Sequence, residues 1–140
     1  MWSAGCSFAE IMNGKILFPG QHYIEQINLI INLRGTPDPN TKKQISNEYA
    51  LKYIESLPAK ERVPLSEIFP SFPREAHDLL DKMLDLNPNS RITVNDALSH
   101  PFLESMHDPE DEPEFEGSID FSFEDDQSLN LEKVKRLILK

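Results

Sequence analysis

Residues 2–20, WSAGCSFAEIMNGKILFPG, are the stretch that decides the predicted fold. Read as a helix, residues 3–13 place apolar side chains around most of the circumference instead of along one stripe. That pattern is typical of a helix buried on nearly every side. Gly14 stands where a helix stop is expected, and Pro19 and Gly20 close the connection to the next segment. We therefore expect residues 3–13 to be the buried centre of a larger helical domain, of which this chain is the later part.

The composition is that of an ordinary globular protein. The 140 residues are 39% hydrophobic and 27% charged, and no apolar run is long enough for a membrane helix. The N-terminus lacks the basic, apolar and small-residue pattern of a secretion signal. Cys6, the only cysteine, lies inside the expected buried helix, so we assign it a packing role. We expect a protein of the cytoplasm and nucleus with no membrane partner.

The net charge of -10 comes from one segment. Residues 1–103 carry 12 acidic and 10 basic side chains, whereas residues 104–128 carry 11 acidic side chains and no Lys or Arg. Residues 129–140 reverse the sign, with one acidic side chain against four basic ones. Because this excess of negative charge repels phosphate backbones, we expect no nucleic acid partner.

Hydrophobic periodicity predicts helices along the rest of the chain and no strand. The expected helices cover residues 23–33, a short stretch ending at 43, and residues 47–57, 74–85, 94–99 and 131–139. Thr93 and Asp96 form a start similar to a capping box. Four prolines between residues 58 and 73 favour an extended connection, and its apolar anchors are Leu65, Ile68, Phe69 and Phe72. The fold class is therefore mainly α, with an extended acidic arm before the short final helix.

Sequence motifs of common enzyme sites do not occur in these residues. We find no glycine-rich phosphate loop, CxxC pair, HExxH or GxSxG sequence. Four histidines are scattered at spacings that suggest no shared metal, namely His22, His77, His100 and His107. Residue chemistry alone thus indicates a helical domain with an acidic arm and no metal site.

Several motifs, taken in order, nevertheless resemble a known family. They are WSAGCSFAEI from residue 2, LFPG from 17, YIEQINLI from 23, GTP from 35, IFPSFPREAHDLLDKMLDLNPNSRITVNDALSHPFL from 68 and HDPEDEP from 107. This order is similar to the C-terminal lobe of the MAP kinases, which are protein serine/threonine kinases. WSxGC and the Arg of xRIT are shared by many protein kinases, whereas the segment after GTP and the HDPEDEP arm narrow the resemblance to MAP kinases.

The resemblance implies a domain layout. Residues 1–103 would be part of the kinase C-terminal lobe from its helix F onward, with the MAP kinase insert at about 36–72, and residues 104–140 would be the C-terminal extension. Trp2 and Arg91 would have structural roles, because Arg91 resembles the kinase Arg that pairs with a Glu after the activation loop. The last helix resembles the one that packs on the smaller kinase lobe, so we expect it to fray here.

Phosphoryl transfer needs further motifs that these 140 residues do not contain. They are the glycine-rich loop, the ATP-positioning Lys, the HRD loop and the DFG metal ligand. We therefore expect an inactive fragment that binds no cofactor itself, with ATP and Mg²⁺ implied for the parent kinase.

An acidic docking site is the first surface that the resemblance implies. Asp108, Asp111 and Glu112 match the family's common docking site, which receives the basic end of docking peptides. Those peptides belong to MAP kinase kinases, phosphatases and protein substrates. On charge alone a solvated acidic linker is an equal alternative, and the HDPEDEP match favours docking.

A second docking surface is implied by four residues that match the pocket for aromatic motifs in the extracellular-signal-regulated branch of the family, namely Tyr23, Ile24, Ile27 and Tyr53. Apolar residues at helical spacing usually belong to a core, and we keep that interpretation for Ile27. Tyr23 is the better candidate for an exposed face.

Two other functions stay open at this point. The chain could be a stand-alone docking module that competes for MAP kinase partners without catalysis. It could also derive from a related kinase, such as a cyclin-dependent one, although HDPEDEP would then lack a role.

Overall fold

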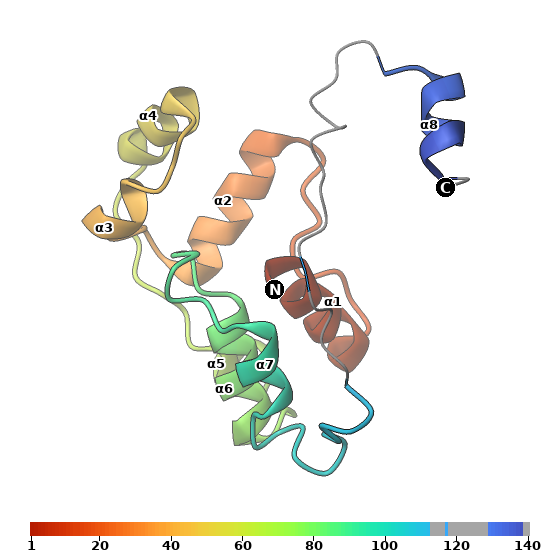
Figure 1. The fold of residues 1–140 in the computed structure, drawn as a ribbon. Helices are drawn as coiled ribbons and strands as arrows, with labels where there is room; N and C mark the ends of the chain where they lie inside the picture. Colours follow the sequence, from red (N-terminus) through yellow and green to blue (C-terminus); the bar gives the residue numbers. More distant parts are fainter. Residues whose placement is uncertain (113–116, 118–128, 139–140) are drawn as a thin grey trace. The chain divides into compact units, whose positions relative to one another are not determined.

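The computed structural model describes residues 1–112, 117 and 129–138, which form two units, Met1–His107 and Asp108–Lys140. The first unit contains seven helices, which are labelled in Figure 1. They are α1 (Trp2–Asn13), α2 (Tyr23–Arg34), α3 (Pro39–Lys42), α4 (Glu48–Ser56), α5 (Leu65–Ile68), α6 (Arg74–Met83) and α7 (Val94–Leu98). No strand occurs among the described residues, so the prediction of a mainly α fold is confirmed.

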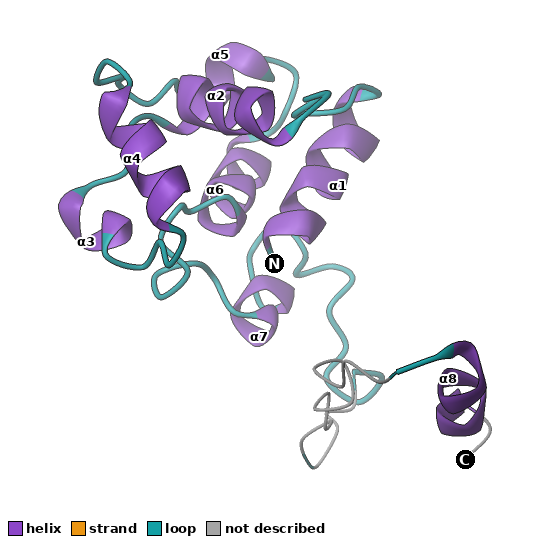
Figure 2. Ribbon diagram, turned by 90° about the horizontal axis from the view of Figure 1, so that it is seen from above, coloured by secondary structure: helices purple, strands orange, loops and turns teal. Residues whose placement is uncertain are grey.

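The core of the first unit is built around α6. Its apolar side chains recur at helical spacing, and Leu79 and Leu80 are 2% and 0% exposed. Leu84, just after the helix, is also fully buried. In both views α1 lies beside α6 (Figures 1 and 2). Because α6 is apolar on one face and charged on the other, it fixes which sides of its neighbours are buried.

Helix α1 forms where the sequence predicts it, but only one of its faces is buried. Gly5 and Ala9 face α6, and a side chain at Gly5 would meet the Cβ of Met83 at 3.0 Å. Ile11 is 81% exposed and Met12 is 40% exposed. The expectation that residues 3–13 are buried on nearly every side is therefore wrong, because helix α6 covers a single face of α1.

Local signals set the helix ends as predicted. Gly14 ends α1 with φ 69°, the left-handed conformation that glycine adopts without steric cost. The Thr93 hydroxyl accepts the backbone N–H of Asp96 at 3.2 Å, which confirms the cap of α7. These caps determine where α1 stops and where α7 starts.

The proline-rich connection contains one helical turn, α5, where an extended chain was expected. Leu65, Phe69 and Phe72 are buried as predicted, and the two phenylalanine rings stack at 4.6 Å between centroids. Ile68 is 45% exposed, so its prediction as an anchor is wrong. A single helical turn between prolines places only part of its side chains toward the core.

The second unit contains α8 (Leu131–Ile138), which confirms the predicted final helix. The expected extended course of the acidic arm falls largely on residues 113–116 and 118–128, outside the described part of the chain. Among the helices that the structure describes, none combines the length and apolar character needed to cross a membrane.

Candidate functional site

A cavity of about 450 Å³ lies between α2 and α4. Its lining includes all four residues that the sequence assigned to one pocket, namely Tyr23, Ile24, Ile27 and Tyr53. Asn47, Tyr49 and Ala50 complete the lining. All three tyrosines of the chain therefore line this cavity, which we call the tyrosine cavity.

Two tyrosines of the tyrosine cavity are exposed, and the third is held by a hydrogen bond. Tyr23 is 77% exposed, as predicted, and Tyr49 is 85% exposed. Tyr53 is held, because its hydroxyl donates to the Asn28 Oδ1 of α2 at 3.0 Å. Exposed tyrosines around an apolar hollow are typical of protein interaction surfaces, since they offer a large contact area at small entropic cost.

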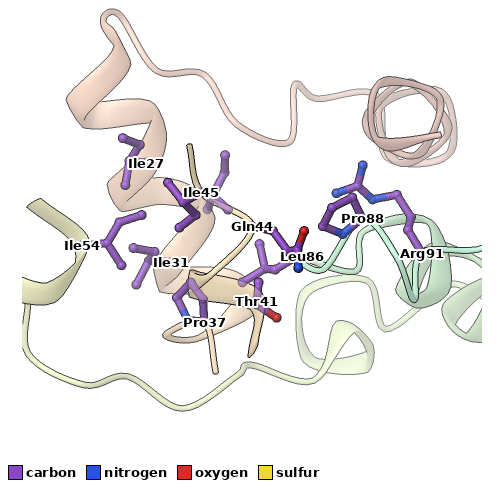
Figure 3. A pocket seen from close by; sticks show the side chains of 11 residues that line it. Ile27, Ile31, Pro37, Thr41, Gln44, Ile45, Ile54, Leu86, Pro88 and Arg91 are labelled. Atoms are coloured by element: carbon purple, nitrogen blue, oxygen red, sulfur yellow. The ribbon is translucent and has the colours of Figure 1, made fainter. Parts of the chain in front are cut away.

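A second cavity, of about 340 Å³, shares Ile27 with the first. Figure 3 shows Ile27, Ile31 and Ile45 on one side of it and Pro88 and Arg91 on the other. The lining is mostly apolar, and Arg91 is its one charged residue. Ile27 is therefore half-buried and lies between two cavities. The sequence favours a core position for Ile27, and the structure does not place it in the core.

Arg91 and Trp2 are in contact, a pairing that the sequence did not predict. The guanidinium carbon of Arg91 lies 5.4 Å from the centroid of the Trp2 ring, a cation–π distance. Arg91 Nε also donates to the carbonyl oxygen of Asp85 at 2.9 Å. No ion pair of Arg91 occurs within the described residues, and the Glu that the resemblance implies as its partner is not among them.

A charged cluster that the sequence did not reveal joins α2 and α6. Arg34, the last residue of α2, has a side chain only 4% exposed. Its Nη1 donates to Asp81 Oδ1 at 2.6 Å, and its Nη2 donates to the Asp81 carbonyl oxygen at 3.1 Å. Arg62 pairs with the same carboxylate oxygen. One carboxylate of α6 thus binds two guanidinium groups.

Burial shapes the electrostatics of this cluster. Burial lowers the pKa of Arg34, while the nearby Asp85 charge raises it. Burial also lowers the pKa of Arg62, and the positive charge of Arg34 adds to this shift while Asp85 opposes it. Arginine stays charged at neutral pH despite such shifts. The guanidinium groups of Arg34 and Arg62 would therefore repel each other if the Asp81 carboxylate did not lie between them.

A buried histidine forms another polar cluster on α6. His100 is 4% exposed, and its Nε2 lies 2.9 Å from Asp78 Oδ2. Its Nδ1 accepts the backbone N–H of Phe102 at 3.3 Å, so the ring proton sits on Nε2 and is donated to Asp78. The hydrogen bond from Lys82 holds the pKa of Asp78 below its ordinary value of 3.8, and the hydrogen bond from His100 adds to this shift. This cluster ties residues 99–102 to α6.

The predicted acidic docking residues form a turn at the start of the second unit. Glu110 N–H donates to Asp108 Oδ1 at 3.1 Å, and Asp108 N–H donates to Glu112 Oε1 at 3.2 Å. Asp111 N–H donates to the Asp108 carbonyl oxygen at 3.0 Å. Asp108 and Asp111 are exposed and Glu112 is half-buried. We call residues 108–112 the acidic turn.

In the described part of the chain, no three His, Cys, Asp or Glu side chains are placed to hold a metal. Cys6 is half-buried, and burial raises its thiol pKa. A thiol with a raised pKa is mostly protonated at neutral pH and therefore a weak nucleophile.

Comparison with known proteins places the chain in a family. The family described as Protein kinase domain matches residues 1–103. Mitogen-activated protein kinase hog1 of Blastobotrys adeninivorans is 46% identical over 125 residues, which cover 89% of this chain and 31% of that protein. Mitogen-activated protein kinase spm1 of Schizosaccharomyces pombe is 44% identical over 139 residues, covering 99% of this chain and 32% of that protein.

A third relative is mitogen-activated protein kinase sakA of Aspergillus fumigatus, 46% identical over 125 residues, or 89% of this chain and 34% of the relative. The chain thus spans about a third of the length of these curated relatives. It belongs to the protein kinase family and, within it, to the mitogen-activated protein kinases. The resemblance stated from the sequence motifs is confirmed.

Proposed function

We propose that this chain is the partner-docking part of a MAP kinase that phosphorylates serine and threonine in protein substrates. It corresponds to the kinase C-terminal lobe from helix F onward, with the C-terminal extension. Catalysis by the whole protein uses ATP and Mg²⁺ held by motifs that do not occur in these 140 residues. The chain alone does not transfer phosphate, and the protein acts in the cytoplasm and the nucleus.

One observation carries this proposal, namely that Tyr23, Ile24, Ile27 and Tyr53 line a single cavity. They come from two helices, and the family resemblance in the sequence assigns the same four residues to one pocket. The cavity takes an aromatic docking motif, because its apolar walls and exposed tyrosines favour aromatic side chains. The partners that supply such motifs are protein substrates and regulators of the pathway.

The acidic turn is the second docking surface. Its exposed carboxylates attract the basic end of docking peptides from MAP kinase kinases, phosphatases and substrates. Exposed ion pairs contribute only about 0 to 1 kcal/mol each, so this surface steers and selects partners more than it holds them. Binding there is therefore weak and sensitive to salt.

Tyrosine ring signals give a direct test of the aromatic site, because all three tyrosines line the cavity. We expect a peptide with two phenylalanines to shift the ring resonances of ¹³C-labelled tyrosine, and Tyr49→Ala to weaken binding by about tenfold. Ile11→Ala, an exposed apolar position outside the cavity, is the control and leaves affinity unchanged. Unshifted tyrosine signals at saturating peptide would contradict the proposal.

Basic peptides test the acidic turn separately. Asp108→Asn plus Asp111→Asn is expected to weaken binding of a Lys/Arg-rich docking peptide about three- to tenfold at low salt, since two exposed pairs are lost. Glu10→Gln plus Glu75→Gln removes the same charge from exposed positions elsewhere and is the control. If both double substitutions weaken peptide binding equally, the effect comes from net charge alone, and docking at the acidic turn is refuted.

A further inference from the structure

Asp81 binds both ends of one long excursion of the chain. Arg34 ends α2 immediately before residues 35–61, and Arg62 follows them directly. Both guanidinium groups contact Asp81 Oδ1, so the two ends of the excursion meet at one carboxylate of α6. We call residues 35–61 the insert segment and the contact of Arg34, Arg62 and Asp81 its neck.

Backbone contacts place the neck at the same point. Val63 N–H donates to the Leu33 carbonyl oxygen at 2.9 Å, and Thr36 N–H donates to the Lys60 carbonyl oxygen at 3.0 Å. The Thr36 hydroxyl accepts the Lys60 N–H at 2.9 Å. Gly35 makes this approach possible, because a Cβ there would meet the backbone nitrogen of Arg62 at 2.9 Å.

Half of the tyrosine cavity depends on the insert segment. Asn47, Tyr49, Ala50 and Tyr53 belong to the insert segment, whereas Tyr23, Ile24 and Ile27 belong to α2. Within the described residues, one side-chain hydrogen bond joins α4 directly to α2, from Tyr53 to Asn28. The position of α4 against α2 is therefore set largely by how the segment is closed at its base.

Electrostatics make Asp81 the critical member of the neck. The Arg34 guanidinium is almost fully buried, and its Nε has no hydrogen-bond acceptor among the described residues. The positive charge of Arg34 lowers the pKa of Arg62, as expected for two cations in proximity. Without the carboxylate between them these groups repel, and a buried cation would lose its counterion. Asp85 reduces this repulsion without a direct contact to either guanidinium in the described residues.

We propose that Asp81 is a positioning residue that closes the insert segment and thereby holds the α4 wall of the tyrosine cavity against α2. The effect of Asp81 on docking rests on the proposed function, whereas the closure of the insert segment does not. Loss of the carboxylate opens the segment locally while α1 and α6 stay folded. Docking of aromatic motifs then weakens, although Asp81 touches no residue of the docked peptide.

Hydrogen exchange of the full 140-residue chain separates local opening from global unfolding. Asp81→Asn is expected to raise amide exchange across residues 36–61 by about tenfold or more, because a charge-assisted contact is lost. Amides of α1 and of Leu79 and Leu80 should keep their wild-type rates. Glu75→Gln, an exposed carboxylate on the same helix, is the matched control and leaves all rates unchanged.

Arg62→Ala provides a milder variant in case Asp81→Asn does not fold, since the Arg62 side chain is 48% exposed. It should raise exchange over the same residues by a smaller factor. A uniform rise across all helices, or unchanged exchange in residues 36–61, would overturn the role of Asp81.

Peptide affinity gives the second readout. Asp81→Asn should weaken binding of a two-phenylalanine peptide about three- to tenfold, because the binding-competent position of α4 is then populated for a smaller fraction of the time. If the wild-type chain does not bind this peptide, the proposed docking function is wrong. The hydrogen-exchange result still shows whether Asp81 closes the insert segment. If the wild-type chain binds and Asp81→Asn opens the segment without loss of affinity, the positioning role is wrong and docking stands.

Discussion

Arg91 stacks on Trp2, with 5.4 Å between the guanidinium carbon and the ring centroid, and donates through Nε to the Asp85 carbonyl oxygen. This contact joins the first turn of α1 to the segment that leads into α7. Trp2 is the only tryptophan in the chain, so its fluorescence reports on the contact without interference.

Replacing Arg91 should therefore change both stability and fluorescence. Arg91→Ala removes a cation–π contact and a hydrogen bond, and we expect a loss of about 1 to 2 kcal/mol in unfolding free energy. The emission of Trp2 should change in the folded state. Arg74→Ala, at an exposed arginine of α6, is the control. Equal stability and unchanged emission in Arg91→Ala would contradict the stacking.

Helix α6 and the outer face of α1 should respond very differently to truncation. Leu80→Ala removes a side chain that is 0% exposed, and we expect a cost of about 2 to 5 kcal/mol. Ile11→Ala acts on a side chain that is 81% exposed, and we expect a change of less than about 0.5 kcal/mol. Urea unfolding measures both. A comparable loss at Ile11 would mean that α1 is covered in solution.

Two glycines with positive φ separate backbone strain from steric contact. Gly14 has φ 69° and nothing within 4 Å of a Cβ built on it, so Gly14→Ala should cost about 1 kcal/mol. Gly35 has φ 80°, and its Cβ would also meet the backbone of Arg62 and Lys60. Gly35→Ala should therefore cost about 2 kcal/mol or more. Chemical denaturation that shows equal costs would argue against the close approach at the neck.

Asp78 gives a pH dependence of defined sign. Its folded pKa lies below 3.8 because of Lys82 and His100, while the unfolded value is the ordinary one. Its stabilising effect is therefore complete above pH 3.8 and disappears as the pH falls through the folded pKa. Asp78→Asn should be less stable than wild type at neutral pH, by about 1 kcal/mol or less since Asp78 is exposed.

Urea titrations across the acidic range test this prediction. The stability difference between wild type and Asp78→Asn should shrink below pH 3.8. A difference that stays constant down to the lowest accessible pH would show that Asp78 does not act through its charge.

Helix positions could be predicted from the sequence because periodicity and caps are local signals. Gly14 and Thr93 fix their helix ends through backbone conformation and one hydrogen bond. The burial of α1 could not be predicted, because periodicity describes side chains around an axis and not the number of neighbours. Ile11 is apolar and exposed for that reason.

Parts of the candidate sites could also not be predicted from the sequence. Tyr49 is four residues before Tyr53 on the same helix, and that spacing could have suggested that it shares the cavity. Arg34 gives no such signal, since a cation at a helix end is usually exposed and its partner Asp81 lies 47 residues away. A contact at that separation depends on how the whole chain places the end of α2 near α6.

The central claim is that two separate surfaces dock different partner segments, and an amide NMR titration with a Lys/Arg-rich docking peptide tests this separation most directly. We predict that the peptide shifts the amide signals of residues 108–112, with smaller shifts at higher salt, and leaves the tyrosine cavity unperturbed. Shifts confined to other residues, or no shifts at millimolar peptide in low salt, would contradict the assignment of the acidic turn as a docking site.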